Sequence, residues 1–124
     1  LHGHSYTANP LGCAAGLASL DLLLQPACAE RRAAINAVHR DELARLAAAA
    51  PIRHGRVLGT IAAFDVDVED PGYGAAIGGR IKHFCLERGV LVRPLGNVVY
   101  LLPPYCTTED ELRRAWEVVG QALS

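Results

Sequence analysis

The sequence predicts an α+β fold in which helices cover a small, mainly antiparallel sheet. Three observations predict this class. Four stretches have helix caps or apolar residues at helical spacing, an apolar run lies between residues 57 and 66, and a Gly-Asn pair separates two further apolar runs. The expected order of elements is helix, helix, strand, helix, hairpin, helix, and this order favours a layer of helices on one sheet.

The first two helices are predicted from their ends. Asn9 and Pro10 suit an N-cap and a first helical position, so a helix should run from Pro10 to about Leu24. Its small residues predict close packing against a neighbouring element. Residues 27–50 carry apolar side chains at helical spacing and predict a long amphipathic helix with a solvated charged face.

The remaining elements follow from turn and cap signals. Residues 57–66 should form one strand that is buried on at least one face, and residues 70–72 should form a turn. A helix over 73–88 should end at Gly89, and a capping box at 108–111 should begin a helix through Leu123. We assign the acids of that box to capping and not to catalysis. The residues expected to face inward from helix 73–88 are Ile77, Ile81, Phe84 and Cys85.

The composition indicates one globular domain with small-molecule or protein partners. The chain has 124 residues, 51% hydrophobic and 20% charged, which is enough to bury a core. A net charge of -1 gives no basic field for nucleic acid and no polybasic membrane anchor. The most apolar stretch, 11–24, contains Asp21 and falls short of the roughly 20 residues of a membrane span. We therefore expect a cytoplasmic protein that binds neither nucleic acid nor membrane.

Two absences shape the expected chemistry. The chain begins with Leu1 and contains no Met, which predicts a fragment of a longer protein. Lys82 is the sole lysine beside eleven arginines, and its place within a helix predicts a solvated surface residue.

The cysteines and histidines give no sign of a metal site. No pair of cysteines has C-x-x-C spacing, so we expect reduced, buried thiols that pack as small apolar groups. His2 and His4 with Cys13 lack the two ligand pairs of a zinc signature. The four cysteines are Cys13, Cys28, Cys85 and Cys106.

Arg93 lies in an apolar hairpin and predicts a carboxylate site. Gly96 and Asn97 are a two-residue turn signal, and counting outward from them places Arg93 opposite Tyr100 on one face. Pro94 cannot donate to a sheet, so this strand should lie at an edge or break there. A guanidinium binds a carboxylate through two parallel hydrogen bonds, and a phenol adds a third donor. Alternatively, Arg93 pairs with an acid of the protein itself or extends its stem over apolar surface.

The segment Gly3-His4-Ser5-Tyr6-Thr7-Ala8-Asn9-Pro10-Leu11-Gly12-Cys13-Ala14-Ala15 resembles the start of the C-terminal part of class III pyridoxal-phosphate-dependent aminotransferases. The resemblance implies that this loop lies at a dimer interface, where Ser5 binds the cofactor phosphate held by the other subunit. It also implies that Gly3 approaches the substrate and that His4 meets the phosphate, mainly through its backbone. A hydroxyl and amides ahead of a helix N-terminus suit a phosphate dianion, and they equally suit a plain helix cap.

Residues 93–105 resemble the adenosylmethionine-8-amino-7-oxononanoate aminotransferase branch of that family, which serves biotin biosynthesis. This branch moves an amino group from S-adenosylmethionine to 8-amino-7-oxononanoate and forms 7,8-diaminononanoate. The resemblance implies that Arg93 binds the substrate carboxylate with Tyr100 nearby. It also implies a homodimer whose subunits share the site.

The same resemblance implies a division of the chain and a missing part. Residues 1–26 would be the interface loop and linking helix, and residues 27–124 the C-terminal small domain of a fold-type I enzyme. Residues 58–63 would form the first strand of that domain. The Schiff-base lysine and the aspartate that pairs with the cofactor ring lie outside this chain, so no residue here is catalytic and the fragment alone should be inactive.

Two other functions stay open. Another class III aminotransferase, acting on an ω-amino acid or a diamine, would keep Ser5 without needing Arg93 and Tyr100. A stand-alone ferredoxin-like binding module would use Arg93 for an acidic effector and would need no cofactor.

Overall fold

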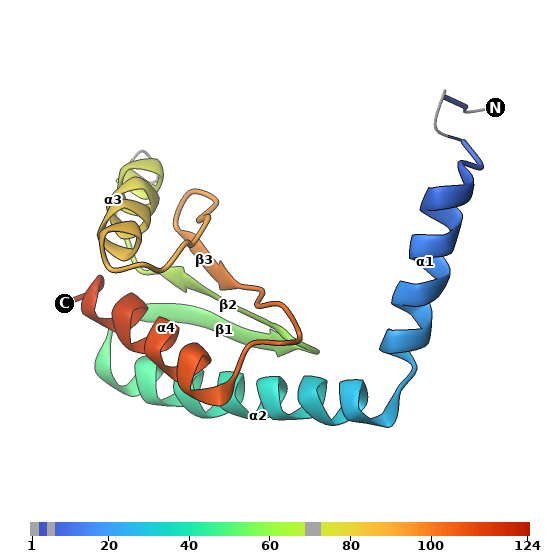
Figure 1. Cartoon of the computed structure of the whole chain (residues 1–124). Coiled ribbons are helices and arrows are strands. Elements are labelled where there is room, and N and C mark those ends of the chain that lie inside the picture. The colour runs from blue at the N-terminus through green and yellow to red at the C-terminus, as the bar shows by residue number, and fades with distance from the viewer. Residues whose placement is uncertain (1–2, 5–6, 69–72) are drawn as a thin grey trace.

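The structure is a computed structural model that describes residues 3–4, 7–68 and 73–124. It confirms the α+β class, with helices against a three-stranded antiparallel sheet of order β1-β2-β3 (Figure 1). The elements of the described residues, in chain order, are α1 Pro10–Leu23, α2 Pro26–Ala49, β1 Ile52–Leu58, β2 Ile61–Val66, α3 Tyr73–Glu87, β3 Val98–Leu101 and α4 Glu109–Gln121.

The core lies between one face of the sheet and the helices α2 and α4. Phe64 of β2 and Trp116 of α4 are almost fully buried, and their ring centroids lie 6.1 Å apart. Alternate residues of β2 and β3 point into this core, as the period of a strand requires. Helix α3 adds Ile81 and Cys85 to the same core, and Ile77 and Phe84 pack against it as predicted.

The predicted single strand over 57–66 is wrong, and so is a first strand over 58–63. The chain turns back at Gly59 and Thr60, so that Leu58 pairs with Ile61 and two antiparallel strands form. Gly59 has a φ of +59°, which glycine adopts without steric cost at the first central position of such a turn. Apolar residues on both sides concealed this turn, and the polar residues of the edge strand β1 concealed its start at Ile52.

The turn at Gly96 and Asn97 is confirmed, but the paired strands on either side of it are shorter than predicted. Leu95 and Val98 exchange two backbone hydrogen bonds of 2.9 and 3.0 Å, and Gly96 has a φ of +61°. Residues 91–94, which precede this turn, form no strand with β3, and β3 pairs with β2 instead. The predicted cross-strand pair of Arg93 with Tyr100 therefore does not form, because Pro94 offers no N–H and the strand breaks there, as expected at an edge.

Helix α1 has the predicted ends but lacks the predicted packing within this chain. Asn9 caps it by accepting a hydrogen bond of 3.0 Å from the Leu11 N–H. None of its residues is buried, and it stands away from the sheet (Figure 1). The helices α1 and α2 meet at a bend of 68°. Among the described residues no single helix is long and apolar enough to span a membrane, although this bent pair together reaches the length and composition.

The other helices match their predicted positions, with one correction. Gly89 ends α3 with a φ of +77°, and Thr108 and Glu111 form the predicted capping box of α4. The charged face of α2 is only partly solvated, because His39 and Glu42 are buried on the side that faces β2 and α4. The predicted turn at residues 70–72 lies outside the described residues.

Gly78 of α3 allows the helix to lie directly against the Gly96 turn. A Cβ atom at this position would collide with the Gly96 carbonyl oxygen and would lie 3.2 Å from Pro94 Cβ. Next to it, Gly79 has open space around its Cβ position. The contact at Gly78 therefore fixes the turn that follows Arg93.

Candidate functional site

Arg93 and Tyr100 line one hollow of about 350 Å³. It lies between the segment that follows α3, the end of β3 and the first turns of α4. Apart from these two residues its walls are mostly apolar. The other lining residues are Val90, Leu91, Val92, Leu101, Leu102, Pro103, Pro104, Thr107, Glu111, Leu112 and Ala115.

Each of the two polar side chains is placed by its backbone. Tyr100 is half-buried on β3, on the side opposite the buried Val99 and Leu101. Arg93 is exposed in the extended segment before Pro94. Across the residues that the structure describes, no acidic group forms an ion pair with Arg93. The structure thus brings Arg93 and Tyr100 to one hollow and leaves the guanidinium available to an anion.

Glu111 is the acidic residue in the lining of this hollow, and its carboxylate already accepts hydrogen bonds from Thr108. Its carboxylate accepts hydrogen bonds from the Thr108 N–H at 2.8 Å and from the Thr108 hydroxyl at 2.9 Å. Both hydrogen bonds hold the pKa of Glu111 below its usual value, and the bond from the Thr108 backbone has the larger effect. The carboxylate therefore caps α4, as predicted.

The loop before α1 is only partly described. Gly3 and His4 are exposed, and Thr7 closes a turn with His4: the His4 N–H donates to Thr7 Oγ1 at 3.1 Å and the Thr7 N–H donates to the His4 carbonyl at 2.9 Å. Ser5, the predicted phosphate ligand, lies outside the described residues. So does His2 of the rejected metal site.

The two parts of the predicted site do not meet within one chain. The loop with Gly3 and His4 is at the far end of α1, away from the sheet and α4 (Figure 1). Arg93 and Tyr100 lie on the opposite side of the joint between α1 and α2.

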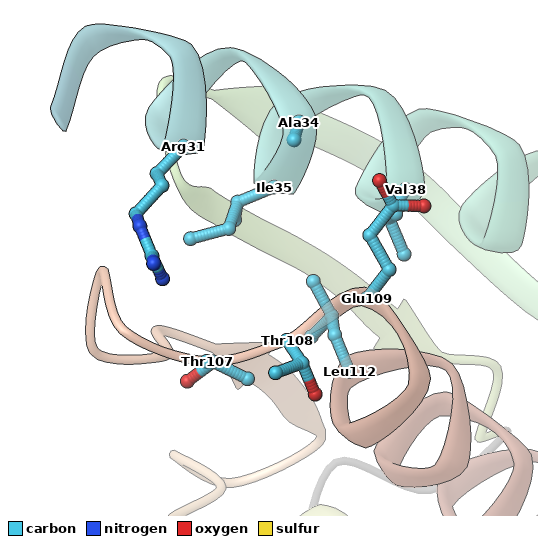
Figure 2. A pocket seen from close by; sticks show the side chains of 8 residues that line it. All are labelled: Arg31, Ala34, Ile35, Val38, Thr107, Thr108, Glu109 and Leu112. Carbon is cyan, nitrogen blue, oxygen red and sulfur yellow. The ribbon is translucent and has the colours of Figure 1, made fainter. Parts of the chain in front are cut away.

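A smaller hollow of about 180 Å³ separates α2 from the start of α4 (Figure 2). Arg31 extends from α2 toward the loop that carries Thr107 and Thr108. Glu109 lines the same hollow, and the N-terminus of α4 is already capped by Thr108 and Glu111. The capped helix end and the Glu109 carboxylate do not favour an anion at this place, although Arg31 lines the hollow.

A buried histidine escaped the sequence analysis. Trp116 Nε1 donates to His39 Nδ1 at 3.0 Å, so His39 Nε2 carries the proton and donates to the Thr60 carbonyl at 3.1 Å. Burial lowers the pKa of His39 below 6.5, and the bond to Thr60 opposes this shift. His39 is therefore a neutral structural residue. Its helical spacing from Ile35, Leu43 and Leu46 was the signal that could have found it.

Two clusters of charged groups elsewhere are paired internally. Buried Glu42 lies 2.8 Å from Arg113 and 2.5 Å from Arg45. On β2, Asp65 accepts hydrogen bonds of 2.9 Å from both His54 and Arg56, which hold the pKa of its carboxyl below the usual value. These ion pairs are structural, and neither borders the hollow of Arg93.

None of the cysteines lines the hollow of Arg93, and neither does the lysine. Cys85 is buried, and burial raises the pKa of its thiol. The predicted burial is wrong for Cys13 and Cys106, which are exposed, and Cys28 is half-buried. In the described part of the chain no three potential ligands gather into a metal site. Lys82 is exposed on α3, as predicted.

Comparison with known families decides the class of the chain. The family model described as "Aminotransferase class-III" matches residues 1–123. The chain belongs to the class III aminotransferases. Solved structures of this family include forms bound to pyridoxal phosphate and to its amino form, both from Vibrio fluvialis, and pyridoxal phosphate is the cofactor of the family. This membership disfavours a stand-alone module without a cofactor.

Relatives with assigned activities cover nearly all of this chain. It is 45% identical over 122 residues to adenosylmethionine-8-amino-7-oxononanoate aminotransferase of Synechococcus elongatus, and 31% identical over 122 residues to an omega-aminotransferase of Caulobacter vibrioides. Each match covers 98% of this chain and 28% of the relative, so the chain spans just over a quarter of the relatives' length.

A solved structure has the same fold. The adenosylmethionine-8-amino-7-oxononanoate aminotransferase of Methanocaldococcus jannaschii superposes with a TM-score of 0.84 at 29% identity. The match covers 98% of this chain and 29% of that one. An omega-aminotransferase of Paracoccus denitrificans superposes with a TM-score of 0.86 at 27% identity, so the fold alone does not separate the two activities.

Proposed function

We propose that this chain is part of an aminotransferase that transfers an amino group from S-adenosylmethionine to 8-amino-7-oxononanoate and forms 7,8-diaminononanoate. One observation carries the proposal: Arg93, without an acidic partner among the described residues, shares an apolar hollow with Tyr100. The 45% identity to the Synechococcus elongatus enzyme of that name supports it.

The residues of this chain suit one end of pyridoxal phosphate. The loop before α1 offers hydroxyl groups and backbone amides, and we assign Ser5 and His4 to the phosphate. Nothing in the chain suits the aldehyde end, because the sole lysine, Lys82, is exposed within α3. The catalytic lysine is therefore expected in the rest of the protein.

The chain's own residues bind and orient the substrate. Bound pyridoxal phosphate supplies the electron sink for amino transfer. Arg93 binds the carboxylate through two parallel hydrogen bonds and the Tyr100 phenol donates a third, while the apolar walls contact the methylene chain. Fixing the distant carboxylate orients the ketone over the cofactor. Gly3 has nothing within 4 Å of its Cβ position, which leaves room for the substrate at the other end.

Replacing Arg93 in the full-length enzyme tests the substrate. Hydrogen bonds to charged groups contribute about 1.5–3 kcal/mol, so Arg93→Ala should raise the KM for 8-amino-7-oxononanoate roughly tenfold to a hundredfold. Arg114→Ala is the matched control, because Arg114 is exposed on α4 outside this hollow. An unchanged KM in Arg93→Ala would refute the substrate assignment.

We further propose a homodimer in which the loop of one subunit serves the hollow of the other, because the two parts lie far apart within one chain (Figure 1). Mixing full-length Ser5→Ala and Arg93→Ala subunits tests this. In a mixed dimer one of the two sites then has both residues intact, so activity should return above that of either variant alone. If one subunit supplied both residues, every site would carry a substitution and activity would not return.

The second candidate is an ω-amino-acid or diamine aminotransferase, favoured by the 31% identity to the Caulobacter vibrioides enzyme. Such an enzyme needs no carboxylate contact at Arg93. Steady-state assays that compare S-adenosylmethionine with a diamine and an ω-amino acid as amino donors separate the two. Turnover that requires a diamine or ω-amino acid and is insensitive to Arg93→Ala would support this candidate.

A further inference from the structure

We propose that Arg32 is a positioning residue that holds α1 at a fixed angle to the segment that follows Tyr100. This inference rests on the proposed function, in which the loop before α1 and the hollow beside Tyr100 belong to active sites. Arg32 itself contacts neither substrate nor cofactor. It acts through the loop before α1 and the segment beside Tyr100, which are proposed to do so.

The first contact of Arg32 is with the end of α1. The last carbonyl groups of a helix have no partner within the helix, and they carry the negative end of its dipole. In α1 the Leu20 and Leu22 carbonyls accept from the N–H groups of Leu24 and Gln25. The Leu23 carbonyl accepts from Arg32 Nη1 at 3.1 Å. A charged donor thus completes the end of α1 from a different helix.

The same guanidinium reaches two further segments. Arg32 Nη1 lies 3.1 Å from the sulfur of Cys28 in the first turn of α2, and the guanidinium carbon lies 5.7 Å from the centre of the Tyr105 ring. That distance is within the range of a cation–π contact. Tyr105 follows β3 through Pro103 and Pro104, whose fixed φ angles stiffen the connection. Arg32 therefore joins α1, α2 and the segment that continues from Tyr100.

Little else fixes the angle of α1 within this chain. No residue of α1 is buried, and a hollow of about 590 Å³ separates the joint from Tyr105 and Cys106. Helix α1 has 14 residues and is therefore about 21 Å long. A tilt of about 10° at the joint would move its first turn by about 4 Å, whereas errors of about 1 Å can cost a hundredfold in rate. Within this chain, the joint is thus the place where a small change is amplified at the loop.

Arg31 provides a matched control at the neighbouring position. It has the same charge and lies on the same helix, yet among the described residues it forms no hydrogen bond and no ion pair. Arg32→Lys is the second variant. It keeps the charge but loses the planar group that spans the Leu23 carbonyl, the Cys28 sulfur and the Tyr105 ring.

The test uses the full-length enzyme loaded with cofactor and three variants: Arg32→Ala, Arg32→Lys and Arg31→Ala. Hydrogen exchange of the peptide that spans the joint, residues 17–29, should rise about tenfold in both Arg32 variants, because a charged hydrogen bond that restrains the joint is lost. Cofactor retention after dilution should fall several-fold in both, and kcat should fall about tenfold. Arg31→Ala should stay within about twofold of the parent protein in all three measurements.

Three results would overturn the proposal. The first is equal behaviour of Arg32→Ala and Arg31→Ala in exchange and cofactor retention. The second is a drop of several degrees in melting temperature in Arg32→Ala, which would make Arg32 a general stability residue. The third is full rescue by Arg32→Lys, which would show that charge alone suffices. The exchange measurement uses no substrate, so it remains valid if Arg93→Ala refutes the substrate assignment.

Discussion

Helix α1 and the rest of the chain differ in how their apolar residues are packed. From Ile35 onward, α2, the sheet and α4 enclose a core in which Phe64, Val99 and Val119 have no exposed surface. In contrast, α1 carries exposed leucines, including Leu11 at 80% and Leu17 at 64%, and buries none of its residues. Contiguous apolar surface of this kind is usually covered in the complete protein. Within this chain, therefore, packing does not account for the sequence of α1, whereas the rest of the fold is built around a shared core.

The sharpest test of this contrast compares one buried and one exposed apolar residue in the 124-residue chain. Phe64→Ala should lower the free energy of unfolding by about 3–5 kcal/mol, because it leaves a cavity against Trp116. Leu17→Ala should change it by less than about 0.5 kcal/mol, because Leu17 has no cover to lose. Urea unfolding followed by Trp116 fluorescence measures both. A comparable loss in Leu17→Ala would mean that α1 is packed in solution, for example against a second copy.

A second test separates the two faces of α3. Gly78→Ala should destabilise the chain by about 1–3 kcal/mol, because its Cβ would meet the Gly96 carbonyl and the turn would have to shift. Gly79→Ala should stabilise the chain by up to about 1 kcal/mol, because open space surrounds the new methyl group and alanine favours a helix. Thermal unfolding of the pair checks the signs. Equal effects would show that α3 does not rest on the turn.

The mildest test changes only the pH. His39 has a lowered pKa in the folded chain, so the unfolded chain takes up its proton first as the pH falls below about 6.5. The contribution of His39 to the free energy of unfolding should thus be constant above about pH 6.5. Below it, the free energy should fall by at most about 1.4 kcal/mol per pH unit until the folded-state pKa is passed. His39→Gln should flatten this part of the curve.

The elements set by local chemistry were predictable from the sequence. Asn9 with Pro10, Gly89, and Thr108 with Glu111 each satisfy groups of their own helix end, so their positions need no knowledge of the fold. The turn at Gly96 is of the same kind. The turn at Gly59 and Thr60 was missed because these two residues were assigned to the apolar run 57–66, although a glycine followed by a polar residue is itself a turn signal.

The candidate site was predictable only in part. The pattern around Gly96 placed Arg93 and Tyr100 together, and both do line one hollow, although they are not paired across a ladder. Pro94 indicated a break or an edge in this strand, but nothing local indicated that β3 would pair with β2. The contacts of Arg32 were equally inaccessible, because Leu23 and Tyr105 meet it only after the chain has folded.

The contact at Gly78 makes α3 a practical reporter of the substrate end. The backbone of α3 at Gly78 lies directly against the Gly96 carbonyl, so a movement of the turn should move α3 with it. Arg93 lies only three residues before Gly96. With the exposed Cys13 and Cys106 replaced by serine, a fluorophore or spin label on Gly79→Cys, where there is open space, would follow that movement during turnover without touching the residues that bind. The helix that contributes nothing to the chemistry is thus the best place from which to observe it.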